Sequence, residues 1–448
     1  MKAEVLSCTA VRVTDADGTR TVAPGDVPND LVPAPLLRLC ARPPQTWDHA
    51  VSVSPALWEA LFPYQREGVQ RVVHQFRGRC LLADEMGLGK TMQAIAVAQH
   101  YGERALVICP AYLQTTWRRA VQAWSVDAAV CSYGKVPASS DALLMIVDEA
   151  HYLKSFDAKR TQAILPLLLQ APHVLLLSGT PCPNRPAELY ALLHAIRPRV
   201  VPTWLGFSAR YCRPRQTPFG LDTRGSDRPD ELKWLLHRAF WVRRTKDILT
   251  GLPDKLGTVL YADAEPALLP ELQALQCKLN DALQRGSQVA QTLVSEMYRC
   301  TARAKQAAAV ALVQASLKPP ALIFAHHQCM LDAMEQALPG VRLGRIDGRT
   351  SLAARQQVVD GVQAGTIDVA LLSMGAAGCG LTLTAVASAY FLEIPWCPAV
   401  LRQCEARIHR IGQQKTCTMY YILSHETLDS YVWRTIHRKE RVGARIGQ

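Results

Sequence analysis

The stretch Leu81-Leu-Ala-Asp-Glu-Met-Gly-Leu-Gly-Lys-Thr91 decides the fold. It begins as an apolar run typical of a buried strand, passes through a turn that contains two glycines, and continues as a helical pattern. Glycines let backbone N–H groups approach phosphate oxygens, and the first turn of a helix adds partial positive charge. The stretch therefore predicts a strand, a phosphate-binding turn and a helix, the unit from which parallel sheets covered by helices are built.

The last two residues of this stretch predict the chemistry of the site. Lys90 would reach the outer phosphates of a nucleotide, and the Thr91 hydroxyl would bind Mg²⁺. The strict phosphate-loop pattern requires a glycine at position 84, where this chain has Asp84. Taken alone, the stretch also fits a glycine-containing turn that carries a surface lysine.

A second apolar run, residues 143–147, ends in the acids Asp148 and Glu149. Ligands bind at the carboxyl ends of parallel strands, where Asp148 would hold Mg²⁺ through water and Glu149 would polarise the attacking water. An acid pair after a strand is a weak signal by itself. It follows the phosphate loop by one strand-helix unit, and the combination predicts an ATPase.

Short apolar runs alternate with helical patterns along most of the chain, which indicates parallel sheets covered on both faces. The expected strands are residues 80–83, 105–109, 143–147, 173–177, 321–325, 369–372 and 389–392. We therefore expect an α/β protein with two lobes and a helical insertion between them.

Four segments are expected. Residues 1–50 would form a hairpin around Asp17-Gly18 and a Pro-rich linker, and residues 51–203 the first lobe. Residues 204–304 would be a mostly helical insertion that includes the end of the first lobe. Residues 305–448 would be the second lobe with a basic C-terminal helix.

Composition limits the class of protein. The chain has 448 residues, of which 49% are hydrophobic and 20% are charged, and this excludes wholesale disorder. No apolar run approaches the roughly 18 residues of a membrane helix, and no secretory signal precedes the first lobe. A net charge of +12 favours a polyanionic partner. The 14 cysteines form no C-x-x-C pair, so we expect no zinc site and a reducing, intracellular setting.

Taken together, the motifs resemble the Swi/Snf-type ATPases of helicase superfamily two. Asp84-Glu-Met-Gly-Leu-Gly-Lys-Thr91 with Asp148-Glu-Ala-His151 carries the resemblance, because the glutamate-containing phosphate loop is that family's own variant. It implies RecA-like lobes, ATP and Mg²⁺ as cofactors, and a role for Gln65 in reading adenine. In the first lobe the implied ATP-binding residues are Gln65, Asp84, Glu85, Met86, Gly87, Leu88, Gly89, Lys90 and Thr91, and the implied coupling residue is His151.

The second lobe carries the strongest match, Gln403-Cys-Glu-Ala-Arg407-Ile-His-Arg410-Ile-Gly-Gln413. Two arginines three residues apart share one helix face. The resemblance implies that Arg407 and Arg410 are arginine fingers, that Gly380 also binds ATP, and that Gln403 couples hydrolysis to movement. The catalytic set is then Lys90, Asp148, Glu149, Arg407 and Arg410, and the alternative for the arginines is a pair of surface salt bridges.

A motor on DNA needs phosphate contacts on both lobes. The resemblance places these contacts at Pro110, Trp117, Ser132, Tyr133, Gly179, Thr180, Ser373 and Trp396. Trp117 and Trp124 lie seven residues apart on one helix face, so at least one of them is expected in the core rather than on DNA. The basic residues between 199 and 224 fit a DNA-facing insertion or a solvated surface equally well.

Finer features, Gly179-Thr-Pro-Cys-Pro-Asn-Arg185 and Phe324-Ala-His-His327, resemble the HARP-like annealing helicases. The expected activity is therefore ATP-dependent translocation on double-stranded or forked DNA by a single motor, in rewinding, fork remodelling or repair. Alternatives are a chromatin or transcription-complex motor, a strand-separating helicase and a non-catalytic DNA-binding scaffold. The recruiting protein stays open, as does the choice between a nuclear, bacterial or viral setting.

Overall fold

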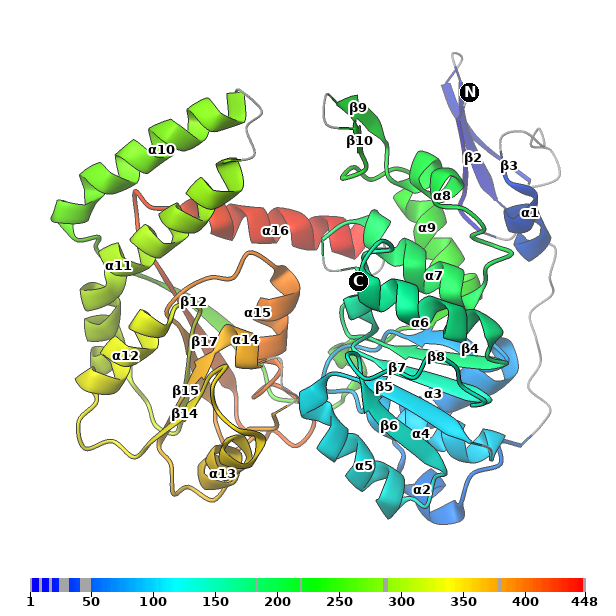
Figure 1. Cartoon of the computed structure of the whole chain (residues 1–448), viewed down its shortest axis with the longest axis horizontal. Coiled ribbons are helices and arrows are strands. Elements are labelled where there is room, and N and C mark those ends of the chain that lie inside the picture. The colour runs from blue at the N-terminus through cyan, green and yellow to red at the C-terminus, as the bar shows by residue number, and fades with distance from the viewer. Residues whose placement is uncertain are drawn as a thin grey trace. The chain divides into compact units, whose positions relative to one another are not determined.

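The computed structural model describes residues 2–7, 10–15, 18–23, 32–40, 50–102, 104–182, 184–217, 220–284, 289–377 and 381–445. The chain divides into two compact units, Met1–Ile248 with Glu440–Gln448, and Leu249–Lys439. Each unit contains one six-stranded parallel sheet covered by helices, as Figure 1 shows. The predicted α/β fold with two RecA-like lobes is thereby confirmed.

The sheet of the first unit has the strand order β11-β4-β8-β7-β5-β6. Its strands are β4 (Arg79–Leu82), β5 (Ala105–Cys109), β6 (Ala128–Ser132), β7 (Leu144–Asp148), β8 (His173–Leu177) and β11 (Trp241–Val242). Alternate residues of a strand point to opposite faces. In β8, Val174 and Leu176 enter one hydrophobic core while Leu175 and Leu177 enter another. Both faces are therefore buried, which explains the apolar runs in the sequence.

Helices from different parts of the chain cover the two faces. One face packs against α2 (Pro55–Ala60), α3 (Pro63–Gln70), α4 (Lys90–Tyr101) and α5 (Gln114–Ala123). The other packs against α6 (Lys159–Gln170), α7 (Tyr190–Ile196), α8 (Trp204–Tyr211) and α9 (Pro229–Leu235).

Arg79, at the start of β4, joins three elements of this unit. Its guanidinium donates to the carbonyls of Leu168 and Ala171, at the end of α6, and of Ala195 and Ile196, at the end of α7. The last carbonyls of a helix have no partner within the helix, and Arg79 supplies one to both helices.

The N-terminal region forms a three-stranded antiparallel sheet of β1 (Lys2–Val5), β2 (Val11–Asp15) and β3 (Gly18–Val22). The β2–β3 pair is the predicted hairpin, with Asp15 opposite Gly18, whereas Ala16 and Asp17 lie outside the described residues. Part of the stretch expected to be a linker is helical, as α1 (Ala34–Cys40).

A buried carboxylate attaches this sheet to the lobe. Glu231 of α9 has 0% exposure, accepts two hydrogen bonds from Arg210, and also accepts bonds from the Tyr211 hydroxyl and the Val5 N–H. Arg228 donates to the carbonyl of Ala3. Arg210, a member of the basic run, therefore has structural partners, which weakens the expectation that the whole run faces DNA. Strands β9 (Arg215–Thr217) and β10 (Gly220–Asp222) form a small hairpin nearby in sequence.

The second unit has the strand order β12-β17-β16-β13-β15-β14. Its strands are β12 (Lys255–Tyr261), β13 (Ala321–Ala325), β14 (Leu343–Ile346), β15 (Val369–Ser373), β16 (Ser388–Phe391) and β17 (Cys417–Leu423). Three of these, β13, β15 and β16, coincide with predicted strands. The covering helices include α10 (Leu269–Gln284), α11 (Ala290–Ser316), α12 (Gln328–Ala337), α13 (Leu352–Gln363), α14 (Met374–Ala377), α15 (Pro398–Glu405) and α16 (Asp429–Arg445).

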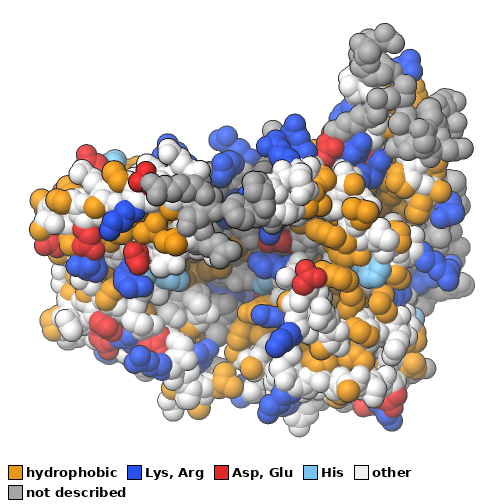
Figure 2. Space-filling view, turned by 45° about the horizontal axis from the view of Figure 1, so that its top comes forward, with side chains coloured by type: hydrophobic (Ala, Val, Ile, Leu, Met, Phe, Trp, Pro, Cys, Tyr) orange, Lys and Arg blue, Asp and Glu red, His pale blue; other side chains and the backbone are white. Residues whose placement is uncertain are grey.

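Basic side chains occur over the whole of the face shown in Figure 2, with acidic ones interspersed, so the surplus of positive charge forms no single patch on this face. Among the described residues, no helix has the length and apolar character that crossing a membrane requires.

Candidate functional site

The phosphate loop, residues 84–89, connects β4 to α4 in the first unit. Gly89 has a φ of +73°, and a Cβ at this position would lie 2.3 Å from Gln65 Nε2, so only glycine fits. Gln65 Nε2 and the Tyr64 hydroxyl both donate to the carbonyl of Leu88, each at 3.0 Å. The amide of Gln65 therefore braces the loop, and its predicted contact with adenine stays a prediction.

Lys90 and Thr91 form the first turn of α4, where backbone N–H groups have no partner within the helix. No described residue accepts a hydrogen bond from either N–H group. The Lys90 ammonium donates to the carbonyls of Asp84, at 2.7 Å, and Glu85, at 3.3 Å. Burial lowers the pKa of Lys90, and the charge of Glu149 opposes this shift. The loop thus offers an ammonium and free N–H donors, which fit the phosphates of a nucleotide.

The Asp84 carboxylate takes part in a buried ion pair. It has 0% exposure and accepts hydrogen bonds from Arg244 Nε at 3.0 Å, Arg244 Nη2 at 2.6 Å and Gln93 Nε2 at 2.9 Å. Arg244 also donates to Gln93 Oε1 and to the carbonyl of Tyr64. The Asp84 side chain therefore supports the loop through a buried ion pair, and the predicted contact of Asp84 with ATP stays a prediction.

Arg244 follows β11, and the sequence reasoning did not assign it a role. The ion pair joins the phosphate loop to the segment that follows this edge strand. A second pair of residues, Glu85 and Lys246, joins the same two segments. Glu85 Oε2 accepts from the Lys246 N–H at 2.8 Å, and Lys246 Nζ lies 3.7 Å from Glu85 Oε1. The available signal was the acid that closely follows the apolar strand β4, because an acid buried there requires a partner.

Gly179 faces the phosphate loop rather than a free surface. A Cβ on Gly179 would lie 2.4 Å from Met86 Cγ and 3.3 Å from Lys90 Nζ. The segment after β8 therefore passes close to the loop, and only glycine leaves room for it. The predicted contact of Gly179 with DNA stays a prediction. Thr180 is 2% exposed and its Oγ1 has no hydrogen-bond partner among the described residues, so this residue is not part of a surface that DNA could reach.

The acid pair lies at the end of β7. Asp148 is buried, and its Oδ1 accepts from the N–H of Glu149 at 2.8 Å. Burial, and then the charge of Glu149, raises the pKa of Asp148 to about 6. Glu149 has a φ of +52°, an unusual conformation for a residue with a side chain. Such strained conformations cluster at functional sites, because surrounding contacts must hold them.

His151 connects the acid pair to the next strand. Its Nδ1 lies 3.2 Å from Glu149 Oε2 and 3.2 Å from the Ser178 Oγ. Ser178 follows β8 and precedes Gly179 at the phosphate loop. His151 was predicted to couple hydrolysis to movement, and its contacts join Glu149 to the segment whose backbone touches the loop.

Trp117 is 1% exposed and donates from Nε1 to Asp148 Oδ2 at 2.9 Å. Its predicted contact with DNA is therefore corrected, because its side chain lies in the core and orients the acid pair. The spacing argument had expected at least one of Trp117 and Trp124 in the core. The helix α5, which carries Trp117, is thus connected to the acid pair by this hydrogen bond.

Tyr133 follows β6 and, like Trp117, donates a hydrogen bond to the acid pair. Its hydroxyl donates to the carbonyl of Asp148 at 2.8 Å and lies 3.2 Å from that of Glu149. The ring stacks on Tyr152, with centroids 5.3 Å apart. The hydroxyl is therefore not free for DNA, and it supports the strained backbone of Glu149.

Pro110 and Ser132 lie at the carboxyl ends of β5 and β6, at the same edge of the sheet as Asp148. Ligands bind at this edge in parallel sheets. Their contacts with DNA stay predictions.

In the second unit, the two arginines do not share a helix face, because α15 ends at Glu405 and both follow it in turns. Arg407 Nη1 and Arg410 Nη1 each donate to the carbonyl of Leu381 at 3.4 Å, and Arg407 Nε donates to the carbonyl of Gln403 at 3.0 Å. Burial, and then the charge of Arg407, lowers the pKa of Arg410 to about 10. Neither guanidinium has a carboxylate partner among the described residues, which argues against the salt-bridge alternative.

Two polar residues that the sequence reasoning did not assign support this segment. Gln413 Nε2 donates to the carbonyls of Val386 and Ile408, and its Oε1 accepts from two backbone N–H groups. Glu405 pairs with Lys255 at 2.7 Å and accepts from the Tyr421 hydroxyl at 2.7 Å. They stabilise the turns that carry the arginines.

The remaining predicted residues of the second unit are less informative. Ser373 is 7% exposed and its Oγ accepts from the Ala376 N–H, so its side chain caps α14, and its contact with DNA stays a prediction. Trp396 is partly exposed and packs against Tyr298 and Tyr431. Gly380 lies outside the described residues.

Comparison with known families agrees with this arrangement. The model of the SNF2-related domain matches residues 64–144 and 130–306, and the model of the helicase conserved C-terminal domain matches residues 304–412. The chain belongs to the SNF2-related family. The resemblance to the Swi/Snf-type ATPases, drawn from the phosphate loop and from residues 403–413, here called the arginine segment, is confirmed.

The relatives of this SNF2-related chain include two kinds of longer proteins. "SWI/SNF-related matrix-associated actin-dependent regulator of chromatin subfamily A-like protein 1" is 33% identical in Drosophila melanogaster, over 93% of this chain and 60% of the relative, and 36% identical in Xenopus tropicalis, over 88% and 46%. "DNA annealing helicase and endonuclease ZRANB3" of Mus musculus is 34% identical over 85% of this chain and 40% of the relative. The chain thus spans about half the length of these relatives.

Among solved structures, the chain matches the "Sulfolobus solfataricus SWI2/SNF2 ATPase core in complex with dsDNA". The match has a TM-score of 0.41 and 19% identity, and it covers 89% of this chain and 94% of the other.

Proposed function

We propose that this chain is an ATP-hydrolysing motor that moves along double-stranded DNA and acts in rewinding, fork remodelling or repair. The observation that carries the proposal is the acid pair at the end of β7: Trp117 donates to the Asp148 carboxylate, Tyr133 donates to the Asp148 carbonyl, and the charge of Glu149 opposes the lowering of the pKa of Lys90. Its family and its relatives support the same function.

The first-unit residues suit ATP and Mg²⁺. The Lys90 ammonium and the free N–H groups of α4 would bind the phosphates, and Mg²⁺ would neutralise their charge. Thr91 and Asp148 are the residues that would hold the ion. The buried, raised-pKa carboxylate of Asp148 fits this role, because a cation would compensate its charge.

Hydrolysis needs one oriented water. Glu149 would accept its proton as the oxygen attacks the γ-phosphorus and the bond to the ADP oxygen breaks. His151 holds Glu149 through Nδ1. Arg407 and Arg410 would stabilise the charge that develops on the transferred phosphoryl group.

DNA binding would act on this step through Trp117 and Tyr133. Both belong to segments at the sheet edge that the resemblance assigns to DNA, and both donate hydrogen bonds to the acid pair. A phosphate contact at these segments would therefore tighten the position of Asp148 and Glu149. This gives DNA a short route by which to stimulate hydrolysis.

The test is ATP hydrolysis by the purified protein without DNA and with single-stranded, duplex and forked DNA. Lys90→Ala and Glu149→Gln are the controls, and Glu149→Gln should still bind ATP. We expect strong stimulation by duplex or fork that both variants abolish. No hydrolysis with any DNA would favour the non-catalytic scaffold.

A second assay separates the remaining alternatives. We expect the protein to re-anneal a partly melted duplex in an ATP-dependent manner, without releasing a labelled strand. Release of the strand would favour a strand-separating helicase, and greater stimulation by nucleosomes than by forks would favour a chromatin motor.

A further inference from the structure

A pocket of about 410 Å³ lies in the first unit, apart from the phosphate loop. Residues 154–157 and 185–191 form most of its wall, together with Trp204 and Thr223. The first segment follows the acid pair of β7, and the second follows Gly179 after β8, so the pocket lies beyond the carboxyl ends of two central strands. Its volume is within the range of about 300–1,000 Å³ that holds small organic groups.

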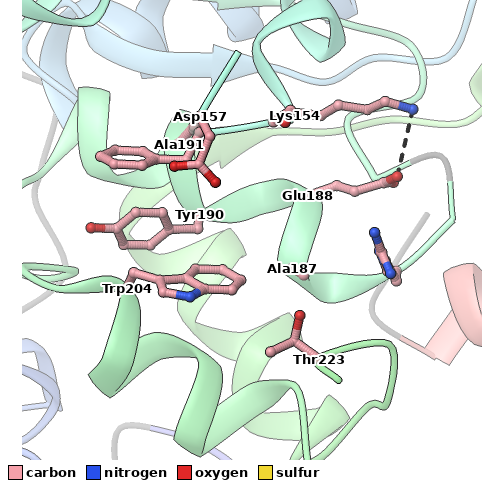
Figure 3. Close-up of a pocket in the computed structure, with 11 residues that line it drawn as sticks. Lys154, Asp157, Ala187, Glu188, Tyr190, Ala191, Trp204 and Thr223 are labelled. Carbon is pink, nitrogen blue, oxygen red and sulfur yellow. Dashed lines mark ion pairs between the residues drawn. The ribbon is translucent and has the colours of Figure 1, made fainter. Parts of the chain in front are cut away.

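One wall of the pocket is aromatic. The ring of Tyr190 lies 5.3 Å from that of Phe156 and 5.3 Å from that of Trp204, centroid to centroid. Tyr190 is 4% exposed, whereas Phe156 is 39% exposed and Trp204 is partly exposed. Figure 3 shows the rings of Tyr190 and Trp204 one beside the other. The rings of Phe156 and Trp204 thus pack against the buried Tyr190 and remain partly exposed to solvent. Aromatic rings with exposed surface can stack on nucleic-acid bases.

The opposite wall is polar. Some of its charged side chains have hydrogen-bond or ion-pair partners, and others have none among the described residues. Glu188 accepts from the N–H and the side-chain Nδ2 of Asn184, and pairs with Lys154 at 3.5 Å, as the dashed line in Figure 3 marks. Within the described parts of the chain, the side chains of Arg185 and Asp157 make no hydrogen bond and no ion pair. The pocket therefore offers one free guanidinium and one free carboxylate beside an aromatic surface.

A single nucleotide residue carries the complementary groups. Its flat base would stack on the rings, N–H groups on the base edge would donate to Asp157, and its phosphodiester would bind the Arg185 guanidinium. One free cation suits one phosphodiester better than a triphosphate, which the phosphate loop is built to hold.

We propose that this pocket binds one nucleotide of DNA whose base has left the helical stack. A base inside a duplex cannot reach such a pocket without being extruded, whereas the unpaired strands at a fork present bases freely. The pocket would thus distinguish forked from plain duplex DNA. This inference rests on the proposed function, since it takes DNA as the substrate.

The test uses forked DNA that carries 5-iododeoxyuridine at one unpaired position beside the junction, with a duplex that carries the same base paired. On irradiation, we expect a crosslink to the peptide that contains Tyr190 or Trp204 with the fork and none with the duplex. Trp204→Leu, which keeps apolar bulk, and Arg185→Gln should each lower the affinity for the fork about tenfold at fixed salt. Their affinity for duplex should change less than twofold.

Lys233→Gln is the matched control, because it also removes one positive charge, from an exposed site on α9 outside the pocket. It should leave the ratio of fork to duplex affinity unchanged. Variants are compared after thermal melting shows a folded protein; should Trp204→Leu fail to fold, Arg185→Gln and the crosslink decide.

Three results would overturn the proposal: equal losses on fork and duplex, a crosslink that maps elsewhere, or a free mononucleotide that binds as tightly as the fork. Displacement of the fork crosslink by a lysine-rich peptide, with unchanged fork affinity, would instead assign the pocket to a protein partner. Crosslinking needs no ATP hydrolysis. A protein that binds forks through this pocket but shows no DNA-stimulated turnover would therefore contradict the proposed function and not this inference.

Discussion

The phosphate loop and the arginine segment solve opposite electrostatic problems. In the loop, the buried charge of Asp84 is matched by the guanidinium of Arg244 at 2.6 Å. In the arginine segment, Arg407 and Arg410 carry like charges, and each donates at 3.4 Å to the same neutral carbonyl. Each acid of the loop has a basic partner, Arg244 for Asp84 and Lys246 for Glu85, whereas Arg407 and Arg410 have no counter-charge among the described residues.

Because of this difference, substitutions in the phosphate loop should mainly change the stability of the fold, and substitutions in the arginine segment should mainly change the activity. Removing one partner of a buried ion pair leaves a charge with no compensation and destabilises the fold. Removing a guanidinium that has no anionic partner costs the fold little, but it removes charge intended for a phosphate. The two regions should therefore respond to substitution in opposite ways.

The largest expected effect is on activity. Arg407→Ala should lower kcat for ATP hydrolysis with saturating DNA by about a thousandfold, the lower range for loss of an arginine finger. The melting temperature should change little. Arg402→Ala, in the same α15 region, is the control and should keep most of the activity. Normal turnover by Arg407→Ala would refute the role of this arginine.

The next effect is on stability. Arg244→Gln should lower the free energy of unfolding of the first unit by about 3–5 kcal/mol, because Asp84 stays buried without its partner. Urea unfolding measures this change. Adding Asp84→Gly, the residue of the strict phosphate-loop pattern, should restore part of the lost stability. If the double variant is no more stable than the single one, the ion pair is not the cause.

A smaller effect on activity is expected at Trp117, which donates a hydrogen bond to Asp148. Trp117→Phe removes the donor to Asp148, a hydrogen bond to a charged group, which contributes about 1.5–3 kcal/mol. We expect kcat to fall at least tenfold while the affinity for DNA stays within twofold. Trp124→Phe, at the C-cap of the same helix, is the control. A loss of DNA affinity with unchanged kcat would instead restore Trp117 as a DNA contact.

The smallest effect is expected at Tyr133. Tyr133→Phe removes the hydroxyl that supports Asp148 and Glu149 but keeps the ring against Tyr152. Loss of one neutral hydrogen bond of about 1 kcal/mol predicts a kcat lowered about fivefold. Steady-state kinetics with duplex DNA measure this. The same fold-loss in Trp117→Phe and Tyr133→Phe would argue against a special role for the charged partner.

The sequence predicted those strands that are buried on both faces, such as β5 and β13, because burial makes the whole strand apolar. It did not predict the edge strands β6, β11, β12 and β14, or β17, an interior strand in which partly exposed residues alternate with buried ones over the first four positions. Edge strands lack the continuous apolar signal, so they are recognised only when a neighbouring strand is known.

The roles of single side chains were harder to predict from the sequence, because their partners lie far away along the chain. The motifs located the phosphate loop and the acid pair, but the partner of Asp84 lies 160 residues away, at Arg244. Helical spacing indicated that Trp117 or Trp124 is buried and gave no means of identifying Asp148 as a partner. Arg407 and Arg410 were placed on a helix because their spacing fits one, whereas the helix ends earlier.

The ion pair between Asp84 and Arg244 also sets an order of events during synthesis. The ribosome makes Asp84 long before Arg244, and the edge strand β11 emerges just ahead of that arginine. Until then a nascent chain carries an acid in its phosphate loop with no counter-ion, and domains fold as units. We therefore expect ATP-binding competence only when the first lobe is complete, and a fragment that ends before Arg244 should not retain nucleotide.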